Sequence, residues 1–259
     1  MSFTEAQIAT LIASVFWPMV RIGALFAAMP LLSNKQVPIK FKAMLSLLIA
    51  ILIAPLLDEP PQVEVFSPEA VLILFQQIAI GVVMGFSLQM VMGTLAIAGE
   101  MIGYSMKLGM AKMADPINGI QVPIVTTLYL TLAMLVIIAL DIHLVMIQLL
   151  VDSFKVFPVS PNGITTDTLW KLIGWATRMF EIGLLMAMPI IGSILLLDVA
   201  QGIMQRAAPQ FQIFAIGFPI TLLAGLILIW VTLPAVMENF IAAMDEMLLF
   251  VRSVILDGN

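Results

Sequence analysis

Cysteine is absent from the sequence, and histidine occurs only once, at His143. The first absence excludes disulfide bonds and thiolate metal sites, and a single histidine excludes a histidine metal cluster. Enzyme motifs are missing as well, since there is no HExxH, no GxSxG with a usable histidine and no phosphate-binding glycine loop. The sequence therefore predicts a protein that is not an enzyme and binds no cofactor.

Charge is also scarce, because only 10% of the 259 residues are charged, against roughly 25% in an ordinary globular domain. Apolar residues make up 62% of the chain and form long uninterrupted runs. A membrane-spanning helix needs about 20 such residues, because hydrocarbon offers no partner to free backbone groups. The net charge of -5 gives no indication of a nucleic-acid partner. We predict an all-α, polytopic membrane protein.

About six apolar segments meet the spanning criterion. They cover approximately residues 8–32, 43–57, 71–105, 123–151, 168–199 and 213–236, and residues 237–256 predict an amphipathic C-terminal helix. No basic residue precedes the first run, so we expect it to be structural rather than a cleaved signal peptide. Ser67 is a predicted N-cap before Pro68. We expect residues 1–259 to form a single domain.

Glycines punctuate the third segment at helical spacing. Gly81 and Gly85 form one GxxxG pattern, and Gly99 and Gly103 form another. Such pairs let two helices approach closely in a bundle. With 16 glycines in the chain, we expect tight helix contacts with other subunits rather than a solitary bundle.

Ionisable side chains inside apolar segments are costly, and each one is a hypothesis for a functional site. Arg178 and Glu181 are three residues apart, so they share a helix face, and a self-neutralising structural pair is the favoured interpretation. Arg21 has Asp198 as one candidate partner across helices. Asp141 and His143 point to different faces of a helix, which does not favour a proton relay.

The run from Gln201 to Gln212 is too polar to face lipid. Pro209 breaks any helix that continues from the fifth segment, next to Gln210. We predict a re-entrant or luminal turn in which Arg206 finds an acidic or carbonyl partner. A cytoplasmic loop with a phosphate-facing arginine is the alternative.

The connection from Lys107 to Val122 is longer than most loops in a compact bundle. It combines methionines and lysines with an Asp-Pro turn and an Asn-Gly turn. An aqueous connector is the simple interpretation, but such a connector gains little from its apolar side chains. A loop folded back into a cavity would use them for packing, and methionine suits that because it re-packs against irregular surfaces.

Four stretches carry a family pattern. They are RIG at 21–23 with MPLL at 29–32, EMIGYSMKLGM at 100–110 with Asp-Pro at 115–116, His143 with Ser153 and Pro158, and DVAQGIMQRAAPQ at 198–210 followed by GFP at 217–219. In these stretches, and over nearly its whole length, the chain resembles the FliR/SctT family, the R subunits of the type III secretion export gate. It departs from that pattern at Asp141-Ile142-His143, because the family has a glycine just before the histidine.

The resemblance implies a fold, partners and a location. One R subunit assembles with P and Q subunits into a helical pore-forming core, next to a B subunit, an A subunit and the basal-body ring of the flagellum in the bacterial inner membrane. Unfolded proteins pass through the channel, and lipid and neighbouring subunits cover the apolar segments. We also expect a structural role in assembly for Arg21, Arg178, Glu181, Arg206, Pro209 and Gln210.

The resemblance further implies that the loop from Met106 to Val122 is a plug in this channel. Its predicted gating residues are Met106, Lys107, Gly109, Met110, Lys112, Met113, Asp115, Pro116 and Gly119. A small-solute or ion transporter is the alternative, with Arg21, Asp141, Arg178 and Glu181 as its polar pathway. A membrane-embedded enzyme ranks last.

Overall fold

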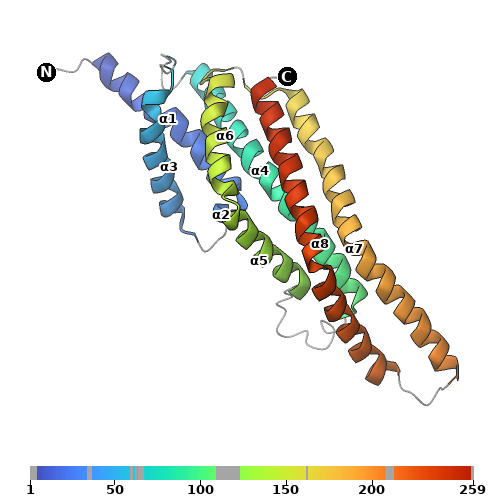
Figure 1. The fold of residues 1–259 in the computed structure, drawn as a ribbon. Coiled ribbons are helices and arrows are strands. Elements are labelled where there is room, and N and C mark those ends of the chain that lie inside the picture. The colour runs from blue at the N-terminus through green and yellow to red at the C-terminus, as the bar shows by residue number, and fades with distance from the viewer. Residues whose placement is uncertain are drawn as a thin grey trace. The chain divides into compact units, whose positions relative to one another are not determined.

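The structure is a computed structural model that describes residues 5–33, 37–58, 61, 63, 67–108, 123–161, 163–207 and 213–257. Within these residues the chain is helical and contains no strand (Figure 1). The helices are α1 (Glu5–Ala28), α2 (Pro30–Ser33), α3 (Ile39–Ile53), the short 3₁₀ helix η1 (Ala54–Leu56), α4 (Pro68–Ser105), α5 (Ile124–Ala139), α6 (Ile142–Val156), α7 (Thr166–Ala207) and α8 (Ile213–Asp257).

The described helices confirm a polytopic membrane protein. Five of them are long and apolar enough to cross a membrane, and a sixth span results if the bent pair of α5 and α6 counts as one. α7 has 42 residues and α8 has 45, so at 1.5 Å per residue they measure about 63 and 68 Å. The hydrocarbon layer is only about 30 Å thick. Part of each helix therefore needs a protein or aqueous environment.

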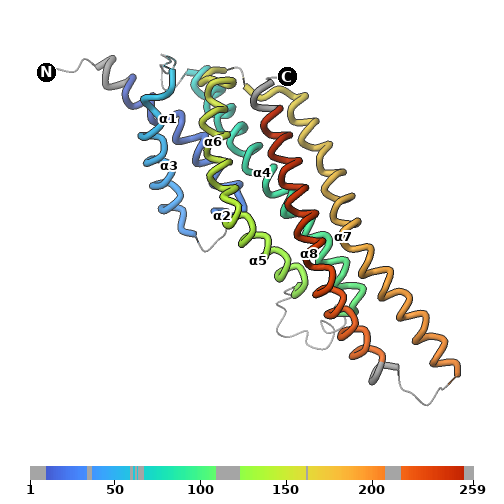
Figure 2. Tube along the Cα trace, in the orientation of Figure 1, coloured from blue at the N-terminus to red at the C-terminus, as the bar shows by residue number. Residues whose placement is uncertain are grey.

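Local signals place some helix ends correctly and others wrongly. Ser67 is the N-cap of α4, because its hydroxyl accepts a hydrogen bond from the backbone N–H of Ala70 at 3.1 Å, and Pro68 is the first helical residue. The predicted segment 123–151 is wrong as a single helix, since α5 and α6 meet at a break with a 64° bend (Figure 2). Residues 237–256 form the last part of the continuous α8 rather than a separate helix.

The prediction of a turn that begins at Gln201 is wrong for residues 201–207, which are helical. α7 continues to Ala207, because glutamine, methionine, arginine and alanine are all good helix formers. The side chain of Gln201 finds a partner on α8, Thr221, without breaking the helix. The remainder of the predicted turn, with Pro209 and Gln210, lies outside the described residues.

One compact unit of the chain is built around a close contact between α1 and α4. It comprises Met1–Met90, Ile137–Ala176 and Asp245–Asn259. A Cβ at Gly81 would collide with the main-chain oxygen of Arg21 and lie 2.7 Å from Ala24 Cβ. A Cβ at Gly85 would lie 2.7 Å from the main-chain oxygen of Leu25. The first GxxxG pattern therefore brings two helices of the same chain together.

The other compact unit joins the second half of α4 to α5, α7 and α8. It comprises Val91–Val136 and Thr177–Met244. A Cβ at Gly99 would lie 2.6 Å from Thr126 Cα on α5, and one at Gly183 of α7 would lie 2.8 Å from the main-chain oxygen of Thr94 on α4. Gly103 has no such neighbour within 4 Å. Of the second GxxxG pattern, only Gly99 therefore makes a close helix contact inside this unit.

Candidate functional site

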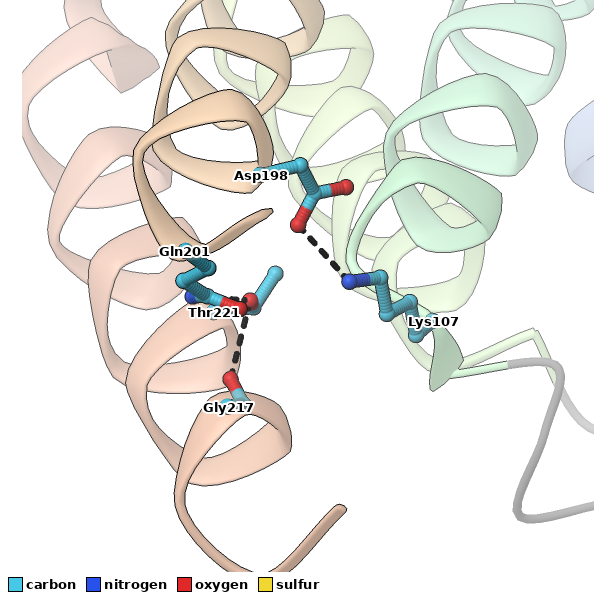
Figure 3. Close-up of polar contacts among 5 residues, drawn as sticks. All are labelled: Lys107, Asp198, Gln201, Gly217 and Thr221. Carbon is cyan, nitrogen blue, oxygen red and sulfur yellow. Dashed lines mark hydrogen bonds and ion pairs between the residues drawn. The ribbon is translucent and has the colours of Figure 1, made fainter. Parts of the chain in front are cut away.

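The first residues of the predicted plug loop, Met106 and Lys107, are called the loop root here. An ion pair of Lys107 holds this loop root to α7. Lys107 is the second residue after the end of α4 at Ser105 and has a left-handed backbone with a φ of 61°. Its Nζ lies 2.7 Å from Oδ1 of Asp198 on α7 (Figure 3). The two side chains are 34% and 33% exposed, so solvent screens the pair in part. The contact fixes where the chain leaves α4.

Met106 holds the same root against α8. Its side chain is fully buried at 0% exposure and fills the space beside Gly225. A Cβ at Gly225 would lie 2.5 Å from Met106 Cε and 2.8 Å from its Sδ. Any side chain at this position of α8 would therefore displace the methionine. Together the two contacts place the end of α4 against both α7 and α8.

A second polar contact joins α7 and α8 beside this ion pair. The Gln201 amide Nε2 donates to Thr221 Oγ1 at 3.2 Å, and the Thr221 hydroxyl donates to the main-chain oxygen of Gly217 at 3.0 Å (Figure 3). Thr221 is fully buried. A buried hydroxyl without a partner would be costly, so the pair satisfies polar groups between two apolar helices.

The described residues hold only the beginning of the predicted gating set. Met106 and Lys107 make the contacts above. The others lie outside the described residues: Gly109, Met110, Lys112, Met113, Asp115, Pro116 and Gly119. Their proposed role stays a prediction.

Arg21 forms a second polar centre, in the other compact unit. It is fully buried at 0% exposure. Its Nε donates to Gln77 Oε1 at 2.8 Å, and its terminal nitrogens donate to Ser153 Oγ at 3.0 Å and to the Phe157 main-chain oxygen at 2.7 Å. The Arg21 Cζ lies 3.8 Å from the centroid of the Phe154 ring. One side chain of α1 thus binds α4, α6 and the C-cap of α6.

The charge of Arg21 is balanced without a carboxylate among its described partners. Phe157 is the C-cap residue of α6, and the last carbonyl groups of a helix carry a partial negative charge. The face of the Phe154 ring attracts the cation as well. The candidate pair of Arg21 with Asp198 is wrong, because Asp198 binds Lys107 and Arg21 binds the groups named above.

The predicted pair of Arg178 and Glu181 is confirmed as a contact within α7. Arg178 Nη1 lies 2.8 Å from Glu181 Oε2, and the side chains are 45% and 52% exposed. Arg206 lies in the last turn of α7 with an exposed side chain. A cation is favourable there, because it faces the negative end of the helix dipole. The assembly roles of these residues stay predictions.

Asp141 occupies the break between α5 and α6 with a left-handed φ of 54°. Glycine adopts that region freely, whereas other residues pay about 1–2 kcal/mol, with aspartate among the more tolerant. The Asp141 side chain is exposed and that of His143 is half-buried.

The two polar centres contain partners that the sequence did not reveal. Gln77 reads as an ordinary polar residue of an apolar helix, and Ser153 stands in the third family stretch without an indicated partner. They lie 56 and 132 residues from Arg21. Both Lys107 and Asp198 stand inside the family stretches, and this was the only available signal for their pairing. Among the described residues, no group of three or more histidine, aspartate or glutamate side chains could hold a metal ion.

The fold and these polar centres define an integral membrane protein built from long helices with polar contacts between them. The family described as "Bacterial export proteins, family 1" matches residues 12–247. The chain is 36% identical to flagellar biosynthetic protein FliR of Escherichia coli (strain K12), over 85% of this chain and 84% of that protein. The chain belongs to this family of bacterial export proteins, the FliR family.

Other relatives carry the same name. Flagellar biosynthetic protein FliR of Pectobacterium carotovorum subsp. carotovorum is 36% identical, over 91% of this chain and 90% of that protein. FliR of Buchnera aphidicola subsp. Acyrthosiphon pisum (strain APS) is 31% identical over 99% of both chains. The similarity thus extends over nearly the whole sequence.

Proposed function

We propose that this chain is a structural and gating subunit of the flagellar type III export gate. With P and Q subunits it forms the channel for unfolded flagellar proteins, next to B and A subunits and the basal-body ring in the bacterial inner membrane. Family membership supports the export role, and the names of the relatives support the flagellar system. The subunit makes and breaks no bond.

The root of the loop is the observation that carries the gating role. Met106 and Lys107 are anchored to Gly225 of α8 and Asp198 of α7. A plain connector needs no such fixed point, whereas a plug must return to the same place after each opening. The length of α7 and α8 also supports assembly, because helices of 42 and 45 residues extend beyond a single hydrocarbon layer.

The chemistry of the loop suits a seal that opens for protein chains. Methionine side chains re-pack against irregular shapes with little strain, and an apolar constriction resists wetting and so holds back ions. Gly109 and Gly119 allow backbone angles closed to other residues, and Asp115-Pro116 fixes one turn. Lys107 anchors the seal, and Lys112 binds acidic or carbonyl groups at its rim.

Deletion of residues 109–119 tests the gate. We expect the deleted protein to assemble but to leak small ions across the inner membrane, measured as membrane conductance or as growth with a toxic permeant solute. The control is a shorter deletion, of residues 59–62, in the acidic loop between η1 and α4, which leaves the Ser67 N-cap in place. A strain that lacks residues 109–119, assembles normally and stays ion-tight shows that the loop is a connector.

Co-expression tests the assembly. We expect the chain to be unstable or aggregated when expressed alone and to be recovered with its P and Q subunits. A well-behaved solitary chain with a solute-transport activity contradicts the proposal and supports the transporter alternative.

A further inference from the structure

α3 is the apolar span that the rest of the chain covers least. Only 17% of the residues of Ile39–Leu56 are buried inside the chain, against 22–44% for the other four described spans. At 100° per residue, the exposed large apolar side chains of α3 occupy an arc of about 140° around the helix. They are 40–65% exposed, and they are Phe41, Met44, Leu47, Leu48, Ile51 and Leu52. We call these positions, together with Lys40, the α3 arc.

The small residues of α3 face its own chain and not the α3 arc. Ser46 and Ala50 are buried, and a Cβ built at Gly23 of α1 would lie 3.9 Å from Ser46 Oγ. The α3 arc contains only phenylalanine, methionine, leucine, isoleucine and lysine. Helix interfaces in membranes are enriched in small residues, because these let two backbones approach closely. The α3 arc therefore suits flexible acyl chains better than a second helix.

The length of α3 also matches lipid. With its 15 residues and the three of η1, the segment extends about 28 Å at 1.5 and 2.0 Å per residue. The hydrocarbon layer is about 30 Å thick, whereas α7 and α8 are about twice as long. Lys40 and Lys42 stand at one end of the segment, and the exposed Asp58 follows at the other. Charges at the two ends and an apolar middle are typical of a helix that spans a lipid layer.

The two lysines at the start of α3 lack acidic neighbours. No acidic residue lies in the first turn of α3, and neither lysine takes part in an ion pair among the described residues. The side chain of Lys40 is exposed and that of Lys42 is half-buried. Long lysine side chains reach from a helix end to the level of the lipid head groups, where they attract anionic lipid. At the other end, the carboxylate of Asp58 repels the same lipid.

We propose that Lys40 and Lys42 bind the head group of an anionic phospholipid whose acyl chains lie along the α3 arc. The lipid belongs to the leaflet at the Lys40 end of the helix. Both ammonium groups contact its phosphate, and the exposed side chains from Phe41 to Leu52 contact its hydrocarbon. This binding site lies beyond the proposed export role and does not depend on which subunits surround the chain.

Quenching by spin-labelled lipid tests the site. Cysteine is absent from this chain, so Met44→Cys places a bimane fluorophore at a known, exposed position of the α3 arc. The full-length chain, with the subunits that co-purify with it, is reconstituted into phosphatidylcholine nanodiscs. These contain a fixed fraction of lipid with a nitroxide on its acyl chain, either phosphatidylglycerol or phosphatidylcholine. The same preparation without Met44→Cys gives the background. We expect the anionic lipid to quench about threefold more strongly or better.

Removal of the two lysines shows whether the head group is recognised. In the Lys40→Gln/Lys42→Gln variant, the ratio of quenching by the two lipids should fall to about one, because the acyl chains still reach the helix. Lys155→Gln/Lys171→Gln removes the same charge from lysines that are 74% and 46% exposed and already paired with aspartates. This control should keep the native ratio, and monodisperse elution of every variant shows that it is folded.

Three results overturn the proposal. Equal quenching of the native lysine pair by both lipids would show that no head group is selected. Absence of quenching by either lipid would show that protein, and not lipid, covers the α3 arc. An equal loss of preference in the Lys155→Gln/Lys171→Gln control would assign the effect to net charge instead of to Lys40 and Lys42.

Discussion

Arg21 on the first helix donates a hydrogen bond of 2.7 Å to the main-chain oxygen of Phe157, at the C-cap of α6. The arginine is fully buried and also binds Gln77 and Ser153. It thereby ties together three helices whose facing surfaces are otherwise mostly apolar. Because van der Waals packing alone is weakly directional in a membrane, such a polar contact selects one arrangement of the helices.

Removal of this side chain should destabilise the protein strongly. Arg21→Ala leaves a cavity and unpaired acceptors at Gln77 and Phe157, so we expect a loss of about 3–5 kcal/mol. Arg21→Lys keeps the charge but cannot reach all three acceptors, and an intermediate loss is expected. The measurement is the unfolding midpoint of the co-expressed protein in detergent. Arg178→Ala is the control, because its exposed ion pair contributes at most about 1 kcal/mol. Equal losses for Arg21→Ala and Arg178→Ala would contradict this account.

Replacement of two glycines of α4 by alanine should change the free energy of unfolding in opposite directions. Gly81→Ala forces a Cβ into the backbone of α1, and we expect it to destabilise by about 1–3 kcal/mol or more through overpacking. Gly103→Ala meets open space, so its better helix propensity should stabilise by up to about 1 kcal/mol. Thermal unfolding of the two variants side by side decides the matter. A neutral Gly81→Ala would show that α1 and α4 do not approach this closely.

The break at Asp141 should tolerate small residues and reject β-branched ones. Its left-handed backbone is strained for valine, so Asp141→Val should cost about 1–2 kcal/mol. The free energies of unfolding of Asp141→Gly and Asp141→Asn should stay within about 1 kcal/mol of that of the native protein, because both residues accept this conformation. The unfolding midpoints of the three variants are compared. If Asp141→Val is as stable as Asp141→Asn, the left-handed conformation is not required.

Charge reversal should identify the anchor of the loop. Lys107→Glu places two carboxylates together at Asp198, and Asp198→Lys places two ammonium groups there, so each single change should release the loop root and increase ion leakage. The double variant restores an opposite-charge pair and should reduce the leak again. We expect a coupling energy of about 0.5–1 kcal/mol, because the pair is one-third exposed. If the two single variants and the double variant leak ions equally, the ion pair does not hold the loop.

Apolar run length and capping residues were enough to predict the class of fold and the start of α4 at Pro68. The break at Asp141 escaped prediction, because apolar residues continue on both sides of it without glycine or proline. The extension of α7 through Gln201 also escaped it, since the partner that satisfies this side chain, Thr221, lies on another helix. The partners of Arg21 are distant in sequence, so only tertiary structure identifies them.

The separation between Arg21 and Phe157 has a consequence for biosynthesis. A ribosome that adds roughly 5–20 residues per second needs on the order of 10 s to make the 136 residues between them. During that interval two of the three acceptors of Arg21, Ser153 and Phe157, do not yet exist, and such an incompletely paired charge is costly in hydrocarbon. We therefore expect the insertion machinery to retain the first helix until α6 emerges. Arrested nascent chains that end before residue 150 should cross-link to that machinery through α1, and chains that extend well beyond Phe157 should not.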